Sequence, residues 1–124
     1  MTTSGLKFLF LSFMLMTLFR VPAQDQSLAD SLIVVYNTLP PKDTIRFEVL
    51  KEIANNQNDP RLKLQYSSKL IEEAKKVKSL HYLHHGYLNE GQAYRLVGDF
   101  DIAIYSLFKA LAIAEEDENI QIGR

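Results

Sequence analysis

Apolar residues recur along most of this chain at three- and four-residue steps, which is the spacing of a helix that buries one face. After residue 44 the stripe consists of Ile45, Phe47, Val49, Leu50, Ile53 and Ala54. Residues 60–78 repeat the pattern, with most of their Lys and Glu residues on the opposite side. No segment alternates apolar and polar residues with period two over the length of a strand. The pattern predicts an all-α protein.

Residues that favour helix ends divide the first part of this pattern. Ser27 and Asp30 have the spacing of a capping box, and Pro40–Pro41 stops the helix that follows because proline has no backbone N–H to donate. Asp43 or Thr44 can cap the next helix through a side-chain oxygen. The predicted helices here are residues 28–38 and 44–56.

Stronger end signals occur further along the chain. Asp59 can cap a helix in which Pro60 takes the first position, and Gly98 can end another helix in the left-handed conformation. The predicted helices are residues 60–78, 79–97 and 100–117. Ile120 and Ile122 then restart the apolar pattern just before the sequence stops, which predicts a fragment or a truncated product of a longer protein.

The first 23 residues differ from the rest. Lys7 precedes an uncharged apolar run from Phe8 to Phe19, and Val21 and Ala23 fit the small-residue pattern of a signal-peptidase site. This run of 12 residues would rise about 18 Å as a helix, whereas a bilayer core is ~30 Å thick. A signal peptide cleaved after Ala23 is therefore favoured over a membrane anchor or a buried helix. It predicts export to a periplasmic or extracytoplasmic location.

Composition excludes several kinds of function. The chain has 124 residues, within the size of one small domain, and its formal charge of −1 comes from 14 basic and 15 acidic residues. These charges are scattered, without a Lys/Arg run that could neutralise successive phosphates, so nucleic acid is not an expected partner. The absence of cysteine excludes disulfides, thiolate metal sites, a Cys nucleophile and lipoprotein processing.

The most regular pattern spans residues 87–110 and predicts a helical hairpin. Aromatic and small residues lie on one face of its first helix, and small and aliphatic residues lie on one face of its second helix. Small residues allow two helix axes to approach closely, while larger rings fill the space above and below. The residues concerned, including the turn glycine, are Tyr87, Gly91, Tyr94, Gly98, Ala103, Leu107 and Ala110.

The order Y-x-x-E-G-x-x-Y-x-x-x-G-D-F-x-x-A-x-x-x-L-x-x-A, which begins at Tyr87, resembles the tetratricopeptide repeat (TPR), a helix–turn–helix unit of about 34 residues. With Gly98 as the turn glycine, the unit covers residues 84–117. Glu90 stands where the family usually has Leu, and Glu115 stands where it often has Pro, which implies looser packing. The resemblance implies a peptide-binding surface at His85, Leu88, Gln92 and Arg95.

The preceding segment resembles a degenerate copy of this unit. Several matching residues are separated by one constant offset, among them Phe47 and Tyr87, Asp59 and Asp99, Leu64 and Ile104, and Ala74 and Ala114. Lys51 and Lys63 replace the equivalents of Gly91 and Ala103. This offset exceeds the usual length of the family's unit, which implies either longer helices or a longer linker near residues 75–80.

The resemblance implies helical hairpins stacked as a short α-solenoid whose groove binds a peptide or a partner helix. The predicted parts of the chain are a signal peptide (1–23), a short helix and Pro-rich linker (24–42), a degenerate hairpin (43–78), a TPR hairpin (79–118) and the start of another helix (119–124). The layout also resembles the exported sensor regions of bacterial signalling proteins. One alternative is thus a sensory extension of a histidine kinase or nucleotide cyclase, with membrane attachment only through a missing downstream segment. A free-standing truncated protein is another.

Catalytic and metal sites are weakly indicated. Two of the imidazoles of His81, His84 and His85 could meet a metal ion, but a third ligand is missing, so structural or solvent-facing histidines are favoured, with pH sensing as a weaker alternative. The acidic pairs at 72–73 and 115–118 lie on polar faces or at a helix end, away from any predicted pocket. Neither a phosphate loop nor a nucleophile motif is present. We expect no enzyme activity, no metal and no cofactor.

Overall fold

The computed structural model describes residues 3–18, 25–121 and 123, whose regular elements are all α-helices. They are α1 (Thr3–Leu18), α2 (Gln26–Thr38), α3 (Ile45–Asn56), α4 (Pro60–Val77), α5 (Leu80–Val97) and α6 (Phe100–Gln121). No strand occurs among the described residues, which confirms the all-α class. Within the same residues, no helix has both the length and the hydropathy needed to cross a membrane.

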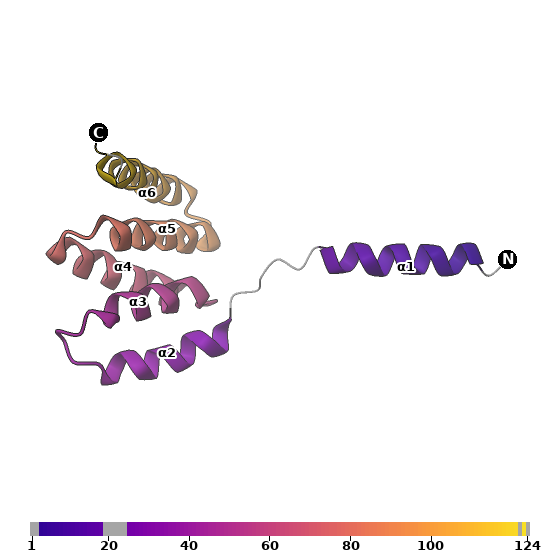
Figure 1. Ribbon diagram of the computed structural model, residues 1–124, viewed down its shortest axis with the longest axis horizontal. Coiled ribbons are helices and arrows are strands. Elements are labelled where there is room, and N and C mark those ends of the chain that lie inside the picture. The colour runs from indigo at the N-terminus through magenta and orange to yellow at the C-terminus, as the bar shows by residue number, and fades with distance from the viewer. Residues whose placement is uncertain (1–2, 19–24, 122, 124) are drawn as a thin grey trace.

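Helices α2 to α6 lie one on another in the order of the chain (Figure 1). Each contacts the next, and α3 also contacts α5. The stack therefore contains two helical hairpins, α3–α4 and α5–α6, with α2 against the first of them. Helix α1 makes no contact with the other helices that the structure describes. The cleavage site predicted after Ala23 lies outside the described residues.

The end signals near the turns of the two hairpins act as expected. Asp59 accepts a hydrogen bond from the backbone N–H of Arg61 at 2.8 Å, and Pro60 occupies the first turn of α4. Gly98 ends α5 with a φ of 86°, a conformation that costs glycine little. Asp43, and not Thr44, accepts the hydrogen bond from the first N–H of α3, on Ile45, at 3.1 Å.

Two predicted helix ends are wrong. Helix α2 begins at Gln26 because Asp25, two residues before the expected cap at Ser27, accepts a hydrogen bond from Leu28 N–H at 3.0 Å. Helix α6 does not stop near Asp117 but continues to Gln121. Glutamate favours the helix, and Gln121 Nε2 donates to Asp117 Oδ2 one turn earlier at 3.0 Å. Residues 119–121 therefore belong to α6 and do not start another helix.

The long offset between equivalent residues of the two hairpins comes from long helices. Helices α4 and α5 have 18 residues each, and only Lys78 and Ser79 lie between them. Lys78 takes the left-handed conformation with φ 55°, and the Ser79 side chain caps α5 by accepting from Tyr82 N–H. The longer linker expected near residues 75–80 is therefore wrong, because most of that segment is helical.

The first hairpin and α2 share the main hydrophobic core, in which Tyr36 and Tyr66 meet edge to face with ring centroids 6.5 Å apart. Its other buried members are Val49, Leu50, Ile53, Ala54 and Leu70. A smaller cluster of Ile71, Tyr87 and Ala110 joins α4, α5 and α6. Burial of these apolar side chains is the main force that holds the stack together.

Two glycines of α5 let it approach both neighbouring helices closely. A Cβ atom placed on Gly86 would lie 2.6 Å from Ile71 Cγ1 and 3.3 Å from Ile71 N of α4. A Cβ atom on Gly91 would lie 2.7 Å from Leu107 Cγ and 3.1 Å from the carbonyl oxygen of Ala103 on α6. Helix α5 thus packs backbone to backbone on two sides.

The first hairpin contains a fully buried lysine. Lys63 on α4 has an exposed fraction of 0%, and its Nζ donates to the carbonyl oxygens of Ala54 and Asn55. These carbonyls belong to the last turn of α3, where the helix dipole favours a positive charge. Burial lowers the pKa of Lys63 to about 8, so its ammonium group is charged at neutral pH.

Candidate functional site

The residues expected to bind peptide all lie on α5. His85 and Gln92 are half-buried and Arg95 is exposed. Leu88 is also half-buried, but it packs against the cluster of Ile71, Tyr87 and Ala110. Its side chain therefore contributes to the core, and the other residues remain candidates for contact with a ligand.

The residues expected to pack the second hairpin occupy its interior, with the exception of the turn. Tyr87, Gly91, Ala103 and Ala110 are buried, and Tyr94 and Leu107 are half-buried. Gly98 is exposed at the turn, where its positive φ and not its packing makes glycine suitable.

A groove of about 650 Å³ opens where α3 and α5 begin and α4 ends. One wall is aromatic, because Phe47 and Tyr82 stack with ring centroids 5.3 Å apart and planes 20° from parallel. Ile45 and Val77 add exposed apolar surface. The remaining lining residues are Thr44, Glu48 and Ser79. A groove of this kind can hold an apolar or aromatic side chain.

Glu48 forms the polar side of this groove. Its carboxylate accepts a hydrogen bond from Tyr82 Oη at 3.2 Å and pairs with Lys51 Nζ at 2.6 Å. The hydrogen bond from Lys51 holds the pKa of the Glu48 carboxyl below its ordinary value, so the group is anionic at neutral pH. Burial, above all, raises the pKa of Tyr82, which keeps its hydroxyl a donor.

His81 and His85 of α5 extend the surface beyond the groove. The ring centroid of His81 lies 4.9 Å from those of Tyr82 and His85. Burial, with smaller effects from His81 and Lys51, lowers the pKa of His85 to about 4. His85 is therefore neutral at pH 7 and can offer one donor and one acceptor. The surface formed by the groove, Lys51 and His85 is called the α3/α5 surface below.

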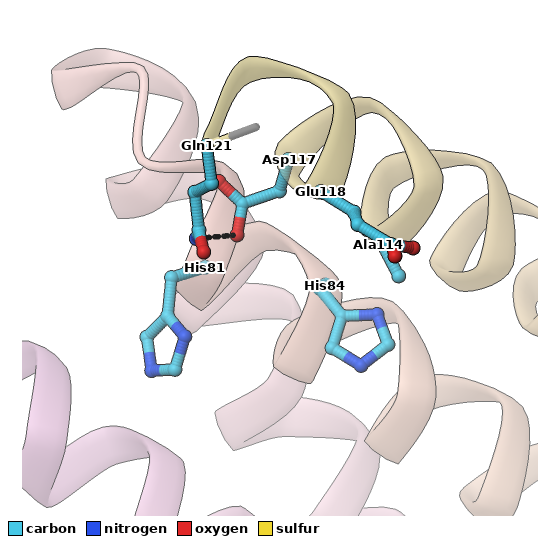
Figure 2. Close-up of a pocket in the computed structure, with 6 residues that line it drawn as sticks. All are labelled: His81, His84, Ala114, Asp117, Glu118 and Gln121. Carbon is cyan, nitrogen blue, oxygen red and sulfur yellow. Dashed lines mark hydrogen bonds between the residues drawn. The ribbon is translucent and has the colours of Figure 1, made fainter. Parts of the chain in front are cut away.

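A second, smaller cleft of about 160 Å³ lies between α5 and α6 (Figure 2). Histidines of α5 line one side, and α6 supplies the other; the lining residues are His81, His84, Ala114, Asp117, Glu118 and Gln121. His84 Nδ1 lies 2.8 Å from the carbonyl oxygen of Ala110, so Nδ1 carries the proton and donates. Among the described residues, no group of three or more His, Asp or Glu side chains is arranged to hold a metal ion.

The outer face of α6 is apolar and uncovered. Ile104, Phe108 and Leu111 are exposed there, and with Leu107 they line a shallow groove of about 280 Å³. Among the described helices, α6 contacts only α5. This face is the second candidate surface for binding.

Sequence reasoning missed several residues that hold these surfaces in place. Asn89 is buried on α5 and donates from Nδ2 to Asn55 Oδ1 on α3 at 2.7 Å, which links the two helices. Gly86 makes the close contact with α4, and Lys63 closes the first hairpin. A glycine inside a helical pattern is a signal for close packing that could have identified Gly86.

Comparison with protein-family models, with curated proteins and with solved structures finds no match to this chain. Membership of the TPR family therefore stays a prediction.

Proposed function

We propose that this protein is a TPR-like protein–protein interaction module that binds a peptide or a partner helix on its α3/α5 surface. The observation that carries the proposal is the contact between α3 and α5, which places the first helices of two successive hairpins side by side. Helices α4 and α6 are not in contact. We therefore interpret α3 and α5 as an inner row of helices and α4 and α6 as an outer row.

Such an arrangement is typical of helical repeats, in which each hairpin packs on the next and the first helices line a concave surface. In each hairpin an Asp residue, Asp59 or Asp99, lies just before the second helix. A short α-solenoid of the TPR type is the interpretation that these features favour. It implies a scaffold without chemistry of its own.

The chemistry of the α3/α5 surface suits a peptide. The stacked rings of Phe47 and Tyr82 offer a flat apolar wall to a ligand side chain. Beside the wall, Glu48 and Lys51 supply an ordered charged pair, and His85 supplies a neutral imidazole. Apolar pockets bordered by a few fixed polar groups provide both affinity and orientation.

Binding to the α3/α5 surface can be tested by selecting short peptides from a displayed random library on the purified full chain. Lys51→Ala and His85→Ala, both at residues of the α3/α5 surface, are expected to weaken the selected peptides by about tenfold each. Glu72→Ala, at an exposed residue of α4, is the matched control and should have no effect. The proposal is wrong if no peptide is enriched, or if the enriched peptides bind both variants as tightly as the original chain.

Export is the second part of the proposal. Helix α1 exposes Leu6, Phe8, Phe10 and other apolar side chains and packs on none of the other described helices, as a removable leader would. Expression of the full gene in a Gram-negative host, followed by fractionation and amino-terminal sequencing, tests this. A periplasmic product that begins at Gln24 is expected, and an uncleaved cytoplasmic product contradicts it.

A further inference from the structure

The outer face of α6 is apolar over its first turns and acidic toward its end. Ile104, Phe108 and Leu111 follow one another at four- and three-residue steps and form a single apolar stripe. Phe108 is 65% exposed, although aromatic side chains of a folded chain are normally covered. The stripe is one turn away from Glu115, where the acidic part of the helix begins.

The acidic part consists of Glu115, Glu116 and Glu118, which are exposed. Their carboxylates form no ion pair with any other described residue. The one basic residue of α6, Lys109, is directed elsewhere: its Nζ lies over the rings of Tyr105 and Tyr87, 4.4 Å and 5.0 Å from their centroids. The outer face is therefore apolar at one end and uncompensated negative at the other.

These charges argue against a second copy of the chain as the occupant. In an antiparallel pair centred on Phe108, Glu115 of one copy would lie beside Asp101 of the other, and two carboxylates would meet at each end. In a parallel pair the acidic ends would lie together. Like charges in direct opposition are unfavourable in either arrangement.

We propose that the outer face of α6 binds an amphipathic helix with apolar residues over three turns, followed by Lys or Arg residues. The apolar turns would cover Ile104, Phe108 and Leu111, and the basic residues would face Glu115 and Glu118. From Ile104 to Glu118 the helix rises about 21 Å, so the partner needs roughly 15 residues. This surface is separate from the α3/α5 surface, and the inference goes beyond the proposed function.

The test uses the full chain and two synthetic helical peptides with the same leucine stripe. One carries four lysines at the end that would face Glu115, and the other carries four glutamates there. Fluorescence anisotropy should show that the lysine peptide binds with a Kd below about 100 µM, and the glutamate peptide at least tenfold more weakly. The double variant Glu115→Lys/Glu118→Lys should reverse this preference.

The apolar part is tested with Phe108→Glu, which should weaken the lysine peptide at least tenfold. Val34→Glu on α2 is the matched control, because Val34 is 66% and Phe108 65% exposed, and it should leave binding unchanged. Circular dichroism of both variants checks that the helices are retained. His85→Ala, which tests the α3/α5 surface, should also leave this binding unchanged, so failure here and failure of the proposed function can be told apart.

Several results would overturn the inference. They are the absence of binding by the lysine peptide, equal binding of both peptides, and binding that survives Phe108→Glu. A dimer in analytical ultracentrifugation that Phe108→Glu dissociates would show that a second copy occupies the face. Flotation of the chain with vesicles of phosphatidylcholine and phosphatidylglycerol that Phe108→Glu abolishes would assign it to a membrane surface instead.

Discussion

The two hairpins close in physically different ways. In α5–α6, Gly91 removes a side chain, and the α5 backbone approaches Ala103 and Leu107 closely. In α3–α4 the equivalent positions are lysines: Lys51 pairs with Glu48 and Glu52 on its own helix, and Lys63 extends from α4 to the carbonyls at the end of α3. The α5–α6 hairpin depends on a residue without a side chain at the helix contact. The α3–α4 hairpin depends on a long side chain with a charged end group.

This difference shows that a similar helix–turn–helix arrangement does not require similar contacts. Substitutions that add volume should damage the second hairpin, whereas substitutions that shorten a side chain should damage the first. A buried ammonium group should also make the first hairpin respond to alkaline pH.

The largest effect is expected for Lys63→Ala. It removes the aliphatic stem of a side chain that is 0% exposed and leaves the carbonyls of Ala54 and Asn55 without their donor, at a cost of about 3 kcal/mol in the free energy of unfolding. Lys63→Met keeps most of the stem and avoids burying a charge, so it should cost about 1 kcal/mol or less. Urea denaturation measures the loss of stability in both variants. Equal losses would show that the ammonium group of Lys63, and not its aliphatic stem, stabilises the fold.

The next effect is the pH dependence of the first hairpin. Burial lowers the pKa of Lys63 from 10.5 to about 8, so between these values the unfolded chain binds more protons than the folded one. The free energy of unfolding should therefore rise with pH from about 8 to about 10, by on the order of 2 kcal/mol. Above about 10.5 the gain ends, because Lys63 is then deprotonated in both states. The raised pKa values of Tyr36 and Tyr82 mean that their ionisation at such pH favours unfolding.

Urea denaturation at a series of pH values measures this rise, and Lys63→Met is the control in which it should disappear. A rise of equal size in Lys63→Met would assign the effect to another group. A flat profile in the original chain would show that Lys63 keeps an ordinary pKa in spite of its burial.

A smaller effect is expected for Gly91→Ala. The new Cβ would lie 2.7 Å from Leu107 Cγ and 3.1 Å from the Ala103 carbonyl oxygen, and this overpacking should outweigh the gain in helix propensity of about 1 kcal/mol. We expect a net loss of about 1 kcal/mol. In the background of Leu107→Ala, which removes the nearest atoms, the loss should shrink or change sign, as a double-mutant cycle would reveal. Stabilisation by Gly91→Ala alone would contradict the close approach.

The smallest effects on stability are expected at the turns of the two hairpins, where Asp59 and Asp99 should differ. Asp59→Ala should cost about 1 kcal/mol because it removes the cap on Arg61 N–H. Asp99 occupies the same place in the second hairpin, but its carboxylate forms no hydrogen bond with the other described residues. Asp99→Ala should therefore change stability by less than about 0.5 kcal/mol. Equal effects in thermal denaturation would show that the two turns are alike.

The sequence was sufficient for features that depend on neighbouring residues. The cap at Asp59 with Pro60 and the left-handed Gly98 were predictable because each acts on backbone groups within a few positions. The start of α2 was wrong because Asp25 and Ser27 both carry a capping oxygen, and the sequence does not show which one the backbone uses.

Features that depend on distant residues were not predictable. A lysine is normally a surface residue, so its burial against α3 was not predicted, although the repeat offset aligned Lys63 with the packing residue Ala103. The link between Asn89 and Asn55 and the hydrogen bond of His84 with the Ala110 carbonyl each join different helices. Leu88 was assigned to the binding surface by resemblance, and only its contacts place it against the core.

The two glycines of α5 also determine how the molecule can move. Gly86 and Gly91 are five residues apart, about 140° around the helix axis, and each touches a different neighbour. Sliding α5 by one residue, about 1.5 Å, or turning it by about 100° would bring a Cβ atom against Ile71 or Ala103. Helices α4, α5 and α6 are therefore held in one register and must shift as one piece. Such stiffness fixes His85 and Gln92 before any ligand arrives and lowers the entropy lost on binding.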